Sequence, residues 1–208
     1  CRAKERGKNT FQFYAAQMNV YSFDRLALES SLRHALERNE FLLHYQPKVD
    51  VRSGNIIGTE ALVRWQHPDM GMVAPAQFIP VAEETGLIVP LGEWVLRTAC
   101  AQNREWQRQG LPRLRVAVNL SPRQFRQENL VRDVARILHE TGLDAGSLEL
   151  EITESMVVQD TGQAAKILTE LRAMGISLSI DDFGTGYLSL AYFKRFPINS
   201  VKIDRSFI

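Results

Sequence analysis

Apolar residues recur along this chain with two periods, and these predict its helices and strands. Apolar residues that recur about every 3.6 positions indicate a helix, and strict alternation of apolar and polar residues indicates a strand. The helical pattern covers residues 24–38, 75–84, 91–109, 122–141, 161–174 and 188–195. The alternating pattern covers residues 41–49, 55–65, 114–120, 147–153, 176–181 and 200–204. From residue 75 onward helices and strands alternate, which is typical of a parallel sheet.

The first helix and the first two strands carry their own signals. Asp24 precedes the first helical pattern and is predicted to cap it. Residues 53–55 read Ser-Gly-Asn, a turn signal between the first two strands. We therefore expect an antiparallel hairpin ahead of the parallel strands.

Each later strand has one strongly apolar face. In the strand at 176–181, Ile176, Leu178 and Ile180 share a face, whereas the other face is polar and ends at Asp181. An open doubly wound sheet, covered by helices on both sides, requires apolar residues on both faces. A barrel requires helix packing only on its outer face. The pattern favours an α/β fold of the TIM-like (β/α)8 barrel type with an antiparallel early strand.

Polar residues occupy the same phase near the ends of five strands, at Glu60, Asn119, Glu151, Asp181 and Lys202. In such a barrel the C-terminal strand ends form the active-site face. Carboxylates that converge in a partly buried place require compensating cations. Oxygen donors suit Mg²⁺ or Mn²⁺, and no His or Cys cluster has the spacing of a zinc site. The sequence predicts a divalent-metal site here.

Four further residues have two interpretations each. Asp182 reaches the site only if the backbone bends at the glycine-containing stretch 183–186; otherwise it caps a turn. Arg64 shares a strand face with Glu60 and either grips a phosphate or forms a surface ion pair. Glu154 is out of phase with the strand before it and could brace a loop. Lys202 could simply neutralise carboxylates.

Composition limits the partners and the compartment. The 208 residues carry 25 basic and 24 acidic side chains, a net charge of +1, so no global field attracts a nucleic acid polymer. The two cysteines form no framework, which fits a reducing compartment, and we expect a cytoplasmic domain. No apolar stretch reaches the length of about 18 residues that a membrane span needs. A membrane anchor elsewhere in a longer parent protein stays open.

The ordered motifs resemble one family. Residues 59–65 read TEALVRW, and YQP at 45–47, VNLS at 118–121, EITE at 151–154, DDFGTGY at 181–187 and VKID at 201–204 follow the same pattern. The chain from 24 to 208 resembles the EAL domain family of bacterial cyclic di-GMP phosphodiesterases. Residues 1–14 resemble the end of a GGDEF domain, the diguanylate cyclase partner often fused upstream, with 15–23 as linker.

The resemblance implies roles for particular residues. The implied metal ligands are Glu60, Asn119, Glu151, Asp181 and Asp182. The implied catalytic residues are Lys202, which orients the attacking water, Asp181 and Glu60. The implied substrate contacts are Gln46, Leu62 and Arg64, and Glu154 would steady the loop after Asp182.

The resemblance also implies a two-metal site for Mg²⁺ or Mn²⁺ that Ca²⁺ inhibits, a homodimer, and linear pGpG as the product. Two features depart from the family pattern. Leu188 stands where the family commonly has Ser. The alternating pattern ends after a sixth barrel strand, whereas the fold has eight, so we expect a domain truncated after its sixth strand.

Two other functions are compatible with parts of the pattern. A catalytically inactive receptor would bind cyclic di-GMP and relay its presence, and the retained carboxylates argue against it. An unrelated barrel enzyme that uses Mg²⁺ for enolate chemistry would need a base on a later strand, and the order of the motifs argues against it.

Overall fold

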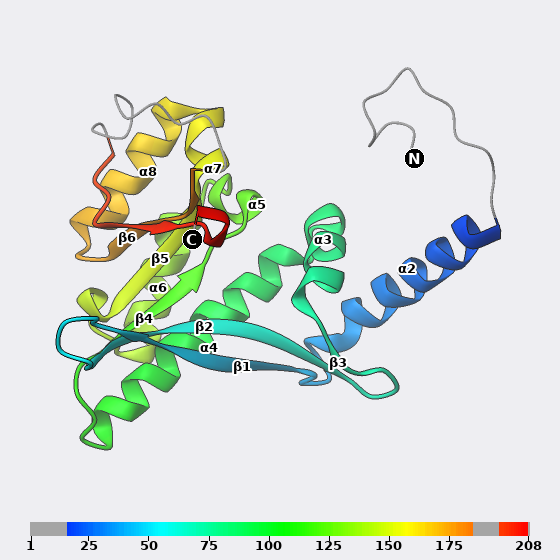
Figure 1. Ribbon diagram of the computed structural model, residues 1–208, viewed down its shortest axis with the longest axis horizontal. Helices are drawn as coiled ribbons and strands as arrows, with labels where there is room; N and C mark the ends of the chain where they lie inside the picture. The colour runs from blue at the N-terminus through cyan, green and yellow to red at the C-terminus, as the bar shows by residue number, and fades with distance from the viewer. Residues whose placement is uncertain (1–15, 185–195, 208) are drawn as a thin grey trace.

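The computed structural model describes residues 16–184 and 196–207, and their strands form a single sheet (Figure 1). The strands are β1 (Phe41–Val49), β2 (Ile56–His67), β3 (Gly71–Val73), β4 (Arg115–Asn119), β5 (Leu148–Thr153), β6 (Ser177–Phe183) and β7 (Ser200–Ile203). The helices are α2 (Ala16–Ala35), α3 (Pro75–Thr85), α4 (Ile88–Arg108), α5 (Pro122–Phe125), α6 (Leu130–Thr141), α7 (Glu154–Gln159) and α8 (Thr161–Ala173). Short 3₁₀ turns cover Ala145–Ser147 and Arg205–Phe207.

The strand order decides between the two sheet architectures. The order is β1-β2-β4-β5-β6-β7, and β3 pairs with the C-terminal end of β2. β1 and β2 are antiparallel, as the turn signal predicts, and β3 also pairs antiparallel with β2. The pairs β2–β4, β4–β5, β5–β6 and β6–β7 are parallel. A doubly wound sheet reverses its direction of growth at a switch point, whereas here each new parallel strand is added on the same side. Right-handed connections then place all the helices on one face, as in a barrel.

The apolar face of the parallel strands forms the core. Val118, Leu150 and Leu178 are each at most 1% exposed, and they lie side by side in the strand register. Helix α6 contacts α4 on one side and α8 on the other, so these helices form a continuous layer. The opposite face of the strands is left to polar side chains, which accounts for the alternation in the sequence.

Several elements differ from the sequence-based predictions. Asp24 lies inside α2, so the predicted cap is wrong; the good helix formers Ala16, Gln17 and Met18 extend the helix upstream. The helix predicted over 122–141 is two helices. Ser121 accepts a hydrogen bond from the backbone N–H of Gln124 and starts the short α5, and a new helix begins at Leu130. The helix predicted over 188–195 lies outside the described residues.

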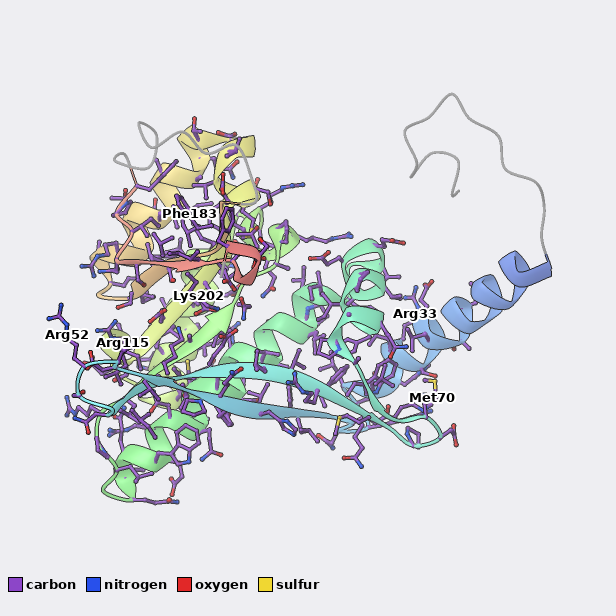
Figure 2. All side chains as sticks on the ribbon, in the orientation of Figure 1. Arg33, Arg52, Met70, Arg115, Phe183 and Lys202 are labelled. Atoms are coloured by element: carbon purple, nitrogen blue, oxygen red, sulfur yellow. The ribbon has the colours of Figure 1, made fainter. Side chains whose placement is uncertain are left out.

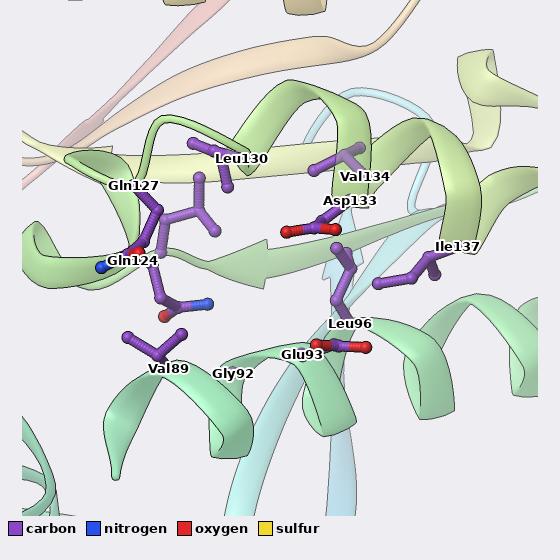
Figure 3. A pocket seen from close by; sticks show the side chains of 11 residues that line it. Val89, Gly92, Glu93, Leu96, Gln124, Gln127, Leu130, Asp133, Val134 and Ile137 are labelled. Atoms are coloured by element: carbon purple, nitrogen blue, oxygen red, sulfur yellow. The ribbon is translucent and has the colours of Figure 1, made fainter. Parts of the chain in front are cut away.

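A small cavity between α4, α5 and α6 marks where these helices meet. It has a volume of about 40 Å³ and a mostly apolar lining, and Figure 3 shows Gln124 directed toward α4 near Gly92. Within the described part of the chain, no helix combines the length and the apolar character that a bilayer crossing requires.

Candidate metal centre

Three carboxylates from three strands meet on the polar face of the sheet. Glu60 comes from β2, Glu151 from β5 and Asp181 from β6, and one oxygen of each lies within 4.8 Å of the others. Asn119 of β4 lies next to them, because its Nδ2 donates to Oε1 of Glu60 at 2.9 Å. The shared phase of these residues thus brings them together in space, as the alternation predicts.

The ammonium group of Lys202 lies among the three carboxylates. Its Nζ donates to Oε2 of Glu151 at 2.8 Å, to Oδ2 of Asp181 at 3.0 Å and to Oε2 of Glu60 at 3.1 Å. Figure 2 shows Lys202 on β7 near the middle of the molecule. Burial alone would lower the pKa of Lys202, but the carboxylates, Glu151 foremost, outweigh burial and raise it. The surrounding carboxylates therefore favour the charged ammonium form of Lys202.

Glu151 is the most deeply buried member of the cluster. Its side chain is 0% exposed, and its two oxygens bind different ammonium groups. Burial raises the pKa of Glu151, while Lys202 and Lys48 act against the rise and Glu60 adds to it. A buried carboxylate of this kind binds a cation well because the positive charge offsets the free-energy cost of burying the negative one.

Lys48 was missed by the sequence analysis. This residue of β1 donates from Nζ to Oε1 of Glu151 at 2.6 Å and to Oε1 of Glu149 at 2.9 Å. The signal was present, since Lys48 follows Gln46 at the strand period of two and Glu149 shares the phase of Glu151. Nothing local to β1 indicates that its side chain reaches β5, two strands beyond β2.

Asp182 lies at the bend that its position was predicted to need. Its φ angle is +53°, and the pairing of β6 with β7 is irregular between Ile180 and Phe183. Asp182 is not one of the three carboxylates within 4.8 Å of one another. Burial first, then the charges of Asp181 and Asp204, raise the pKa of Asp182. An added cation nearby would relieve this repulsion.

Glu154 contacts the loop that follows Asp182. It is the first residue of α7, it is buried, and its Oε2 accepts a hydrogen bond from the backbone N–H of Gly184 at 3.2 Å. The contact ties the end of β5 to the end of β6. This is the geometry that a loop-bracing role requires.

The predicted substrate contacts lie in two cavities: Gln46 lines one together with Glu60 and Lys202, and Leu62 and Arg64 line another. Gln46 is exposed on β1 and lies opposite Glu60 in the strand register. Leu62 and Arg64 line a cavity of about 300 Å³ together with Asn119. Arg64 donates from Nη1 to the carbonyl of Val63, and it forms no ion pair with any described residue. The surface ion pair considered for Arg64 is absent from the described part of the chain, which leaves much of its guanidinium for a ligand.

Comparison with known proteins gives this arrangement a family. The EAL domain model matches residues 29–208. The chain belongs to the EAL domain family. A Pseudomonas aeruginosa relative named bifunctional diguanylate cyclase/cyclic di-GMP phosphodiesterase MucR is 49% identical over 206 residues, which are 99% of this chain and 30% of that protein. Cyclic di-GMP phosphodiesterase PdeR of Escherichia coli is 40% identical over 99% of this chain and 31% of its own length. The chain thus spans about a third or less of these curated relatives.

Solved EAL structures share the fold. A PaMucR phosphodiesterase in complex with c-di-GMP superposes with a TM-score of 0.85 at 51% identity, covering 87% of this chain and 73% of that one. The FimX EAL domain from Pseudomonas aeruginosa bound to c-di-GMP gives a TM-score of 0.77 at 27% identity, covering 88% and 72%. The mostly parallel sheet described above is the TIM-like EAL fold. The predicted truncation of the domain, its boundaries and the GGDEF remnant stay predictions.

The donor set fits a divalent cation. Carboxylate oxygens from Glu60, Glu151 and Asp181 and an amide from Asn119 are the hard ligands that Mg²⁺ and Mn²⁺ prefer. Four acidic groups, these three and Glu149, face three cations: the ammonium groups of Lys48 and Lys202 and the guanidinium of Arg115. The excess of negative charge favours the uptake of a further cation.

Proposed function

We propose that this domain hydrolyses cyclic di-GMP to linear pGpG in a reaction that depends on Mg²⁺ or Mn²⁺. The observation that carries the proposal is the convergence of Glu60, Glu151 and Asp181 from three strands on one point. Membership in the EAL family and the likeness to phosphodiesterases of cyclic di-GMP support the substrate. Two cations in such a site polarise the phosphoryl oxygen and activate the attacking water.

Each residue of the site has a proposed part in this reaction. Glu60, Asn119, Glu151 and Asp181 would hold the metals, and Asp182 would supply a further carboxylate for the second one. Lys202 already donates three hydrogen bonds at the centre, and it orients the water for in-line attack. As an ammonium group it acts as a hydrogen-bond donor, because it has no lone pair with which to act as a base.

The substrate lies along the cavity beside the carboxylates. Arg64 pairs with a phosphate of the dinucleotide, because a guanidinium binds phosphate bidentately. Leu62 offers an apolar contact, and Gln46 contacts the dinucleotide from a second cavity, which it lines with Glu60 and Lys202. Calcium inhibits by occupying the metal site with a looser coordination. A homodimer and an upstream GGDEF domain in the parent protein belong to the same proposal.

Incubation of the protein with cyclic di-GMP and Mn²⁺, followed by chromatography of the products, tests the proposal. We expect pGpG, and we expect Glu60→Gln to lower turnover more than about 100-fold, since loss of a residue that only hydrogen-bonds to a metal ligand already costs about 10–100-fold. Glu105→Gln, on an exposed position of α4, is the matched control. Binding of the dinucleotide without product would favour the receptor function instead.

A further inference from the structure

The two oxygens of Glu151 are held by ammonium groups from opposite sides of the site. Lys202 binds Oε2 at 2.8 Å and Lys48 binds Oε1 at 2.6 Å. The Glu151 side chain is 0% exposed, so bulk water cannot replace either partner. Within the described residues each oxygen of this carboxylate has its own cation.

Lys48 is itself fixed in place. Its Nζ also donates to Oε1 of Glu149 at 2.9 Å, and Arg115 lies 3.9 Å from the other oxygen of Glu149. Figure 2 shows Arg115 near the turn end of the β1–β2 hairpin, apart from Lys202. Lys48 therefore lies between Glu149 on that side and the metal centre on the other.

The two oxygens of Glu151 differ in whether a bound metal would compete with a lysine for them. Lys202 Nζ contacts Oε2 of Glu151 together with one oxygen each of Glu60 and Asp181, so a metal that takes the place of Nζ among the three carboxylates would bind Oε2. It must therefore compete with Lys202 for that oxygen, and the hold of Lys202 on Glu151 weakens when a metal binds. The contact of Lys48 with Oε1 does not compete, so it persists in both states.

We propose that Lys48 is a positioning residue of the metal centre, which grips Oε1 of Glu151 and thereby keeps Oε2 aimed at the point shared with Glu60 and Asp181. The inference rests on the proposed function. Without Lys48, Oε1 of Glu151 is left buried with no hydrogen-bond donor, and the carboxylate rotates toward other donors. Loss of such an outer partner lowers metal affinity by about 10–100-fold.

The direction of the change in Mn²⁺ affinity distinguishes a positioning role of Lys48 from a purely electrostatic one. Removal of a nearby positive charge, by Coulomb's law alone, strengthens the binding of a cation. Loss of the positioning contact weakens it. A purely structural role for Lys48 would lower the stability of the fold and leave the Mn²⁺ affinity of the folded protein unchanged.

Titration of the purified protein with Mn²⁺ alone, followed by calorimetry and by the EPR signal of free Mn²⁺, tests the inference. We expect Lys48→Met and Lys48→Gln to weaken Mn²⁺ binding about 10–100-fold, and Lys48→Arg to restore most of it. Lys166→Met, at an exposed position on α8, is the matched control. Circular dichroism identifies the variants that fold.

Each outcome decides the matter. A folded Lys48→Met or Lys48→Gln variant that binds Mn²⁺ as tightly as the unaltered protein, or more tightly, overturns the positioning role. If neither variant folds, wild-type Mn²⁺ affinity is compared with that of Lys48→Arg, and a loss on this substitution contradicts the expected rescue. An unaltered protein that takes up no Mn²⁺ overturns the metal site of the proposed function, which is a different result from failure at Lys48 alone.

Discussion

Glu151 of β5 and Lys202 of β7 form an ion pair across the intervening strand β6, with 2.8 Å between Oε2 and Nζ. The pair joins residues that are 51 positions apart in the chain. Because Lys202 contacts Glu60 and Asp181 as well, one ammonium group is shared by carboxylates from three strands. Lys202 thus offsets part of the negative charge of the site.

Lys202→Met should destabilise the metal-free protein by about 1–3 kcal/mol, because three carboxylates lose a shared cation in a partly exposed site. Added Mn²⁺ should recover more stability in the variant than in the unaltered protein. Urea unfolding with EDTA and with Mn²⁺ measures both. Equal gains from Mn²⁺ in the two proteins would contradict this account, and Lys166→Met serves as the surface control.

Asp182→Asn should stabilise the metal-free protein at neutral pH. The raised pKa of Asp182 means that its ionised form is disfavoured in the folded state by burial and by Asp181 and Asp204. This penalty exists above the ordinary pKa of an aspartate and disappears as the pH falls below it, where Asp182 is protonated in both states. The gain in the urea midpoint should therefore shrink from pH 7 toward pH 4. The exposed Asp69→Asn control should show no such trend.

Glu154→Gln should lower kcat while metal affinity stays nearly constant. Glu154 accepts a hydrogen bond from Gly184 in the loop after Asp182 and is not part of the three-carboxylate cluster. An amide keeps the shape but accepts a weaker hydrogen bond, so we expect a loss of about tenfold in turnover, in line with one charge-assisted hydrogen bond. Kinetics and Mn²⁺ calorimetry check the separation. A parallel fall in Mn²⁺ affinity would place Glu154 in the metal site instead, and Glu170→Gln on exposed α8 is the control.

Gly92→Ala should destabilise the junction of α4 and α5. A Cβ at this position would clash with Nε2 of Gln124, whose Oε1 accepts hydrogen bonds from the backbone N–H and the hydroxyl of Ser121. Overpacking of this kind costs about 1–3 kcal/mol, against a gain of up to about 1 kcal/mol in helix propensity. In a Gln124→Ala background the clash is gone, so the same substitution should become stabilising. Urea unfolding of the four proteins measures the change of sign.

The convergence of Glu60, Asn119, Glu151, Asp181 and Lys202 could be predicted from the sequence, because strand alternation fixes the face on which a side chain lies. The positions of most strands follow for the same reason. The break between α5 and α6 was not predictable from apolar spacing, which continues through both helices. The left-handed φ of Asp182 also leaves no local mark, since an aspartate occurs in turns of many kinds.

The contact between Lys48 and Glu151 could not be predicted from the sequence. The two residues lie 103 positions apart, and each has a predictable face. Whether the faces meet depends on how β1 is placed relative to β5, across β2 and β4. The local sequence pattern determined the strands, their polar face and the family. The packing of strands that are distant in the chain decided which ammonium group binds which oxygen. Hydrogen bonds act over only a few ångströms, and the assembled sheet alone brings the two groups that close.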